Sequence, residues 1–236
     1  MPSATARASL LAGASGSSRS VVTGSQRIRP FVQSSRAVVS VSSGRVSGAA
    51  PDPGIPDEEI LDRARAYVRL TAETLAALPA LAQAVEAFDP VPGPAGESVA
   101  AWLRGQALQE PQEATIRARL SYGRITGVYA LCAAQVALAE DARAELGGLH
   151  YRTQPAVLLA QFARAADAEG SGGELLEHAV GATRRALWWI GATVLVVDPF
   201  DEATDGYWRE HWGLKPSEQR VPGNRRLRRL WTAIPR

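Results

Sequence analysis

The feature that most constrains the fold is a glycine-rich turn between a predicted strand and a predicted helix. The turn EGSGG, residues 169–173, follows the apolar run PAVLLAQFARA and opens a segment whose apolar residues recur every three or four positions. A continuous apolar run, ATVLVVD, comes next and predicts a strand buried on both faces. Strand, turn, helix and strand in this order indicate a mixed α/β domain.

The glycine-rich turn has two explanations. Glycines accept the positive φ angles of a tight connection, and that alone would account for them. The other explanation is phosphate binding, because free N–H groups and the helix dipole both attract anions at a helix N-terminus. The turn lacks the GK[ST] ending of a nucleotide-triphosphate loop and the G-x-G-x-x-G spacing of a dinucleotide site.

The chain changes character near residue 57. Residues 1–56 are rich in Ser, Gly, Ala and Arg and contain one acid, Asp52, which predicts a basic disordered tail. An organelle transit peptide has the same composition.

Residues 57–236 are predicted to form one folded domain. Its first segment, 57–70, has helical spacing, although AYVRL at its end also fits a strand. Residues 88–97 predict a loop, and the closing strand is expected at 230–234 after a basic loop.

The run DAEGSGGELL, residues 167–176, resembles the acyl-CoA loop of GNAT acetyltransferases, which is Q/R-x-x-G-x-G/A followed by an apolar pair. Asp167 stands where that family usually has Gln or Arg. WLRGQAL, GRITGVYAL, IGATVLVVDPFDEA, YWREHWGLKP and RRLWTAI are similar to further segments of the GNAT toxins of toxin–antitoxin modules, in the same order. The resemblance covers about 170 residues and is therefore stronger than the loop alone.

This resemblance implies an α/β (α+β) fold with a mostly antiparallel sheet, flanked by helices and splayed between its fourth and fifth strands. It implies transfer of an acetyl group from acetyl-CoA to a primary amine. The pantetheine arm would pair with the fourth strand, and the pyrophosphate would lie on the turn. The implied cofactor-binding residues are Phe162, Ala163, Arg164, Ala165, Glu169, Gly170, Ser171, Gly172, Gly173 and Glu174.

The proton donor to the departing thiolate has more than one candidate. Tyr207 has the chemistry, because a phenol with a pKa near 10 can protonate a thiolate. Counting four residues back from Gly213, the spacing of the family's tyrosine, gives Arg209, as though one residue were inserted. By position Trp208 would then replace the tyrosine. Water could also supply the proton.

The acceptor amine also stays open between an aminoacyl-tRNA, a small molecule and a protein. The basic segment 220–229, with Arg225 and Arg226 as tentative substrate residues, could hold tRNA phosphates or be a basic surface only. An antitoxin partner and a homodimer are implied as possibilities, in the cytoplasm and away from membranes. The alternative function is a non-catalytic CoA- or RNA-binding module.

Other titratable residues have simpler interpretations. No Cys/His set has metal-ligand spacing, so no metal site is predicted. His178, on the polar side of the helix after the turn, is expected to be solvated.

Overall fold

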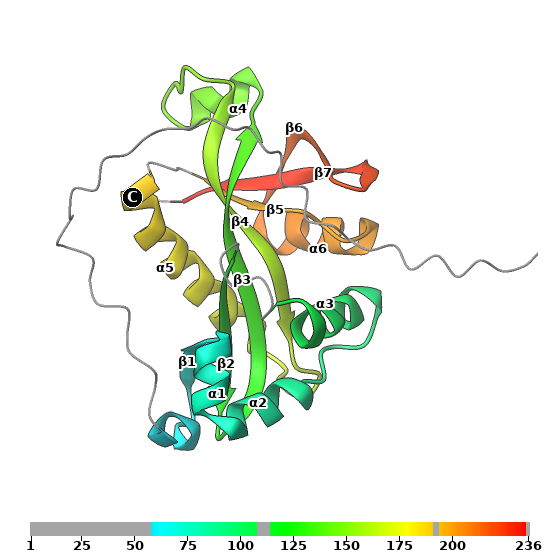
Figure 1. The fold of residues 1–236 in the computed structure, drawn as a ribbon. Coiled ribbons are helices and arrows are strands. Elements are labelled where there is room, and N and C mark those ends of the chain that lie inside the picture. The colour runs from blue at the N-terminus through cyan, green and yellow to red at the C-terminus, as the bar shows by residue number, and fades with distance from the viewer. Residues whose placement is uncertain (1–57, 108–113, 191–193, 235–236) are drawn as a thin grey trace, which may run out of the picture. The chain divides into compact units, whose positions relative to one another are not determined.

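A computed structural model describes residues 58–107, 114–190 and 194–234, all within the compact unit 43–236. The predicted tail, 1–56, lies outside these residues and stays a prediction. A central sheet carries helices on both faces (Figure 1). In chain order the elements are η1 (Glu58–Asp62), β1 (Ala66–Arg69), α1 (Ala72–Ala77), α2 (Pro79–Glu86), α3 (Pro94–Gly105), β2 (Thr115–Ser121), β3 (Arg124–Ala137), α4 (Glu140–Glu145), β4 (Thr153–Arg164), α5 (Gly172–Ile190), β5 (Val194–Val197), α6 (Glu202–Trp212), β6 (Lys215–Val221) and β7 (Asn224–Ala233).

The seven strands lie in the order β1-β2-β3-β4-β5-β7-β6. Every neighbouring pair is antiparallel except β4 and β5, which are parallel and joined by the crossover helix α5. The predicted mixed, mostly antiparallel sheet is confirmed.

Short-range signals set several element ends. The β2–β3 turn has positive φ at both Tyr122 (47°) and Gly123 (75°), as a two-residue hairpin of the I′ type requires. Asp201 begins α6 with a capping box, because its side chain accepts from the Thr204 N–H. Gly213 ends α6 in the left-handed conformation (φ 65°).

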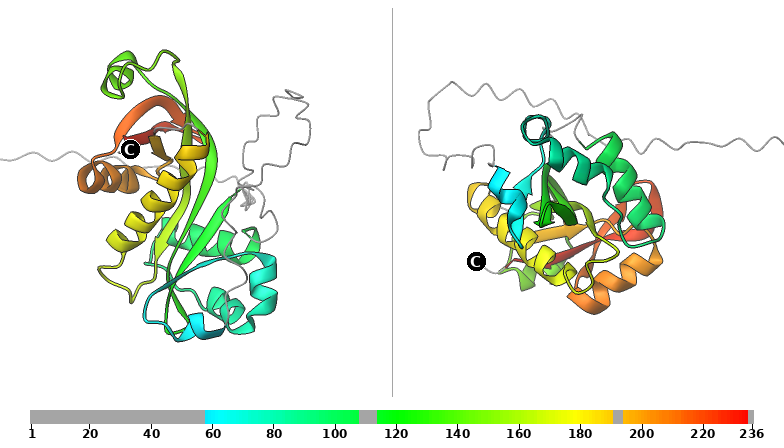
Figure 2. Two further views of the ribbon diagram at one scale, coloured as in Figure 1. Left: turned by 90° about the vertical axis from the view of Figure 1, so that its left-hand side faces the viewer. Right: turned by 90° about the horizontal axis from the view of Figure 1, so that it is seen from below.

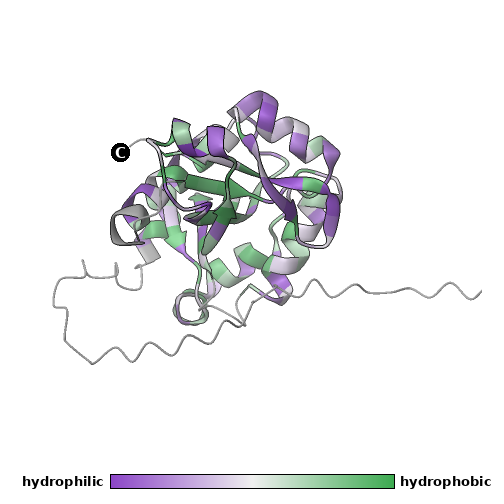
Figure 3. Cartoon of the chain, turned by 90° about the horizontal axis from the view of Figure 1, so that it is seen from above, coloured by the Kyte–Doolittle hydropathy of each residue, from purple (hydrophilic) through white to green (hydrophobic). Residues whose placement is uncertain are grey.

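Different helices cover the two faces of the sheet (Figure 2), and apolar side chains are buried between each face and its helices. On one face, α1, α2 and α3 cover β1 to β3 around Leu81, Leu103 and Ile116. On the other face, α5 and α6 cover β3 to β5 and β7 around Leu175 and Trp208. Figure 3 shows the apolar residues gathered on the central strands and polar ones on the outer helix surfaces. None of the helices in the described ranges is long and apolar enough to span a membrane.

A gap between β4 and β5 opens beyond their last pairing. The two strands pair from Ala156↔Val194 to Leu159↔Val197, and there β5 ends. β4 runs five residues farther, after a register shift in its pairing with β3 near Leu159. The predicted splay between the fourth and fifth of the family's strands corresponds to this gap.

Residues 66–69 form a strand, which decides between the two structures that the sequence left open for AYVRL. Two other sequence-based expectations change. α3 begins at Pro94, inside the predicted loop 88–97, because proline is tolerated in the first turn of a helix. The predicted basic loop after α6 is the hairpin β6–β7. Only Ser217 and Val221 of β6 are buried, so this edge strand carries too little apolar alternation to be recognised.

Candidate functional site

The glycine-rich turn leads directly into the N-terminus of α5. Gly170 has φ 78°, in the region that favours glycine, and α5 begins at Gly172. The Ser171 hydroxyl donates to the Ala168 carbonyl at 2.7 Å, so it turns back instead of capping the helix. The N–H groups of the first helical turn have no acceptor within the helix. Such N–H groups can bind an anion, and here they follow the end of β4.

The edge of β4 that faces the gap offers backbone hydrogen-bonding groups. The Ala165 N–H points toward β3 and donates to the Thr126 carbonyl at 3.0 Å. The Arg164 carbonyl points to the opposite edge of β4 and accepts from the Val91 N–H at 3.1 Å. Backbone groups alternate between the two edges of a strand, so Phe162 directs its N–H and C=O toward the gap. Of the predicted pantetheine-binding segment, 162–165, Phe162 therefore borders the gap, whereas Pro90 and Val91 pair with the same edge at Arg164 and Ala165.

Helix α6 packs an aromatic side chain against the end of β4. Trp208 is 7% exposed, and its ring lies edge-on to Phe162 with centroids 5.5 Å apart. Tyr207 is 41% exposed, and its ring stacks on His211 at 4.8 Å and lies 5.6 Å from Trp208. The structure thus brings Trp208 against β4 and leaves Tyr207 on the solvent side of α6.

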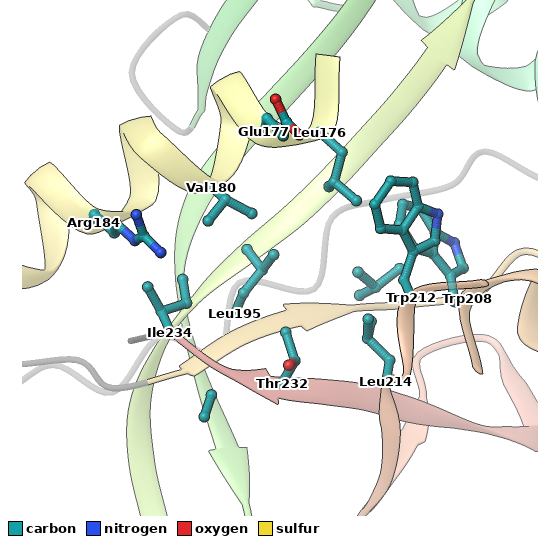
Figure 4. A pocket seen from close by; sticks show the side chains of 12 residues that line it. Leu176, Glu177, Val180, Arg184, Leu195, Trp208, Trp212, Leu214, Thr232 and Ile234 are labelled. Atoms are coloured by element: carbon teal, nitrogen blue, oxygen red, sulfur yellow. The ribbon is translucent and has the colours of Figure 1, made fainter. Parts of the chain in front are cut away.

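An apolar pocket of about 460 Å³ lies between α5 and α6, over β5 and β7. Figure 4 shows Glu177 and Arg184 projecting from α5 at its edge and the two tryptophan rings at its other end. A Cβ added at Gly173 would lie 3.9 Å from the Trp212 ring, so the pocket adjoins the turn. Its apolar lining consists of Leu176, Val180, Leu195, Val197, Trp208, Trp212, Leu214, Ala233 and Ile234.

The two tentative substrate arginines lie on the β6–β7 hairpin. Leu230 of β7 pairs with Val197, the last residue of β5. Arg225 and Arg226 come before Leu230 on an antiparallel strand, so they lie past the end of β5, at the end of the sheet where the gap opens. Both side chains are exposed.

His178 is half-buried against two tyrosines, whereas the sequence predicted a solvated side chain. Its ring stacks on Tyr67 with centroids 3.5 Å apart, and its Nδ1 lies 2.8 Å from the Tyr129 hydroxyl. Burial lowers the pKa of His178 to about 4, with the charges of Arg185 and Arg117 acting in the same direction. Burial also raises the pKa of Tyr129 to about 12. The imidazole is therefore neutral, and its contacts with Tyr129 and Tyr67 connect α5 to β3 and β1.

Arginines that sequence reasoning did not single out pair with the acids of the turn region. Arg124 pairs with Asp167, and Arg119 binds Glu174 at 2.7 Å. The partners in these two pairs are 43 and 55 residues apart, so no short-range sequence pattern predicts the pairs. Within the described ranges, no group of three or more His, Cys, Asp or Glu side chains is placed to hold a metal ion.

A mostly antiparallel sheet with one parallel pair, a crossover helix that starts at a glycine-rich turn and a gap between the paired strands defines the GNAT fold. Within that class, the solved structures similar to this chain include the toxin AtaT and a mutant of KacT. The sequence itself matches no protein-family model and no curated protein.

Three solved structures illustrate the likeness. AtaT complexed with acetyl-methionyl-tRNAfMet is 18% identical over 63% of this chain and 86% of its own, with a TM-score of 0.52. A tyrosine-to-phenylalanine mutant of KacT is 16% identical over 73% and 96%, with a TM-score of 0.55. A bacterial toxin is 13% identical over 72% and 90%, with a TM-score of 0.56. At these identities the likeness establishes the fold.

Proposed function

We propose that residues 57–236 form an acetyltransferase domain that transfers the acetyl group of acetyl-CoA to a primary amine. The observation that carries this proposal is that β4 continues beyond the Leu159–Val197 pair without pairing to β5, with the glycine-rich turn at the same end of β4. A pantetheine arm can pair with the free edge of Phe162 while its pyrophosphate lies on the first turn of α5. The fold shared with AtaT, which has been solved with acetyl-CoA, supports the same assignment.

The chemistry needs few side chains. The amine nitrogen attacks the thioester carbonyl carbon, and a backbone N–H on the gap edge of β4 stabilises the charge on its oxygen. The C–S bond then breaks, the ammonium loses a proton to water, and the thiolate takes one. Tyr207 is the proposed donor of that proton. It can act only if its ring turns from His211 toward Trp208 and the gap.

An aminoacyl-tRNA is the acceptor that we favour. AtaT has been solved with acetyl-methionyl-tRNAfMet, and the hairpin of this chain places Arg225 and Arg226 at the end of the sheet where the gap opens. Guanidinium groups at that end can bind the phosphates of an acceptor stem. Such an acceptor implies action in the cytoplasm. AtaT has also been solved with the C-terminus of its antitoxin AtaR, so we propose that this chain binds an antitoxin as well. A homodimer stays a prediction.

One observation favours a second candidate, a CoA-binding module without catalysis. Trp208, which has no acidic proton, is the α6 side chain packed on Phe162, and Tyr207 is turned to solvent. This module would bind acetyl-CoA on the same turn and release no thiol.

The first experiment is calorimetric titration of the full chain with acetyl-CoA, beside a Gly172→Glu variant. The new carboxylate would lie on the N-terminus of α5, so we expect binding to be lost. Gly105→Glu is the matched control, because a Cβ there meets nothing within 4 Å and the residue is at the end of α3. A folded wild-type chain that does not bind acetyl-CoA would refute the proposal.

A thiol-release assay with aminoacyl-tRNA, a polyamine and a peptide then separates the two candidates. Release that depends on one acceptor identifies the enzyme and its substrate class. Binding of acetyl-CoA without release for any acceptor supports the non-catalytic module.

A further inference from the structure

The turn that is proposed to bind a pyrophosphate contains three acids. Asp167, Glu169 and Glu174 lie within eight residues of one another. A carboxylate about 8 Å from a phosphate charge costs about 2 kcal/mol at an effective dielectric constant of 20. Glu174 is the most serious conflict, because a carboxylate in the first turn of a helix is itself attracted to the N–H groups that a phosphate would use.

The structure holds the Glu174 carboxylate with two guanidinium groups. Its Oε2 lies 2.7 Å from Nη2 of Arg119, and its Oε1 lies 3.1 Å from Nη1 of Arg65. Both carboxylate oxygens therefore have a partner. In addition, the Tyr67 hydroxyl donates to the Glu174 carbonyl at 3.2 Å, so the backbone of this residue is held from the same side.

Arg119 is a fixed support rather than a mobile surface cation. Its side chain is 9% exposed, and its Nη1 donates to the Thr126 hydroxyl at 2.7 Å. That hydroxyl in turn donates to the Arg119 carbonyl at 3.2 Å. The guanidinium is thereby set under the first turn of α5, where it can hold Glu174 from the sheet side.

Two further arginines surround the turn. Arg124, at the start of β3, pairs with Asp167. Arg164, at the end of β4, places its Cδ 3.8 Å from the Cβ position of Gly172, and its Nη1 donates to the Ala165 carbonyl at 3.1 Å. Four guanidinium groups thus face three carboxylates around the turn, so the region is not acidic despite its sequence.

We propose that Arg119, assisted by Arg65, is a positioning residue for the pyrophosphate of acetyl-CoA. It acts through Glu174 by holding that carboxylate off the N–H groups of α5 and neutralising its charge. Arg164, beside Gly172, is the cation best placed to meet the phosphates. This inference rests on the proposed function and adds to it how an acidic turn accepts an anion.

The test is a double-mutant cycle on the full chain, read as the Kd for acetyl-CoA. Arg119→Met is expected to weaken binding about tenfold, because the released carboxylate repels the phosphates. Glu174→Gln in the same chain is expected to restore wild-type affinity. Arg65→Met tests the same idea at an exposed residue, with a smaller loss that Glu174→Gln also restores. Arg152→Met is the matched control, since it breaks a 2.7 Å pair with Glu218 at the other end of β4.

A second ligand separates electrostatics from misfolding. S-acetylpantetheine lacks the pyrophosphate, so its Kd is expected to be the same for the wild type and Arg119→Met. A loss with acetyl-CoA that Glu174→Gln does not restore, or an equal loss with both ligands, would overturn the inference and leave the proposed function standing. So would an unchanged Kd in Arg119→Met and Arg65→Met. A wild-type chain that fails to bind acetyl-CoA is the different result that removes the proposed function.

Discussion

Replacing Gly127 with alanine tests how closely the proposed phosphate-binding helix is seated on the sheet. A Cβ at Gly127 would lie 2.8 Å from Cδ2 and 3.3 Å from Cδ1 of Leu175, and 3.4 Å from the Ala163 carbonyl oxygen. Leu175 is fully buried in the first turn of α5, so its side chain has no free space to turn into. The added methyl group must therefore displace α5 or strain Leu175.

Overpacking of this kind costs about 1–3 kcal/mol. For a domain of about 150–250 residues, each kcal/mol lowers Tm by roughly 2–4 °C, so the expected fall is roughly 2–12 °C. Strand propensity alone predicts the opposite sign, because glycine is less favourable than alanine by about 0.5–1 kcal/mol. The result therefore distinguishes tertiary packing from local preference.

Urea and thermal unfolding of the full chain measure the effect. Gly181→Ala is the control, since a Cβ there meets nothing within 4 Å and alanine favours the interior of α5 by about 1 kcal/mol. We expect the two variants to move in opposite directions. Gly127→Ala with a Tm equal to or above that of the wild type would refute the close seating of α5 on β3.

Four further outcomes follow from the described contacts. Tyr207→Phe should lower kcat in the thiol-release assay about 100-fold without changing the Kd for acetyl-CoA, because the phenol supplies only a proton. An unchanged kcat would show that water protonates the departing thiolate. Asp201→Ala removes the capping box of α6 and should lower the free energy of unfolding in urea by about 1 kcal/mol. Asp198→Asn disrupts two bonds of 2.6 and 2.7 Å to the largely buried Arg229, and a cost of about 3 kcal/mol is expected in the same assay. The folded pKa of His178, about 4, lies below its unfolded value of 6.5, so the unfolded chain takes up the proton first as the pH falls. Stability should then drop between pH 7 and pH 5 by about 1 kcal/mol after solvent screening, and His178→Gln should show a smaller drop; equal slopes would contradict the burial of a neutral ring.

Much of the fold follows from interactions between residues near one another in the chain. Glycine's freedom at positive φ and the helical period after it locate the turn and α5. The uninterrupted apolar run at Val194–Val197 predicts a strand buried on both faces, and all four of its residues are buried. Asp201 and Gly213 mark the ends of α6 because capping is a contact within one turn. The order of such segments indicates a mixed α/β domain, and the resemblance of several segments to GNAT proteins added the expectation of a mostly antiparallel sheet.

Only the tertiary structure decided which side chains meet across the sheet. The Arg119–Glu174 and Tyr129–His178 contacts join residues 55 and 49 positions apart, and each depends on how α5 lies over β2 and β3. The same is true of α6, where one helical step separates a buried Trp208 from an exposed Tyr207. The sequence by itself determined most of the elements and their order, since those depend on backbone conformation and apolar period, but not the edge strand β6, which has little apolar alternation. The charge of the turn and the residue that faces the gap depend on distances between elements, and these exist only once the sheet and its helices have packed.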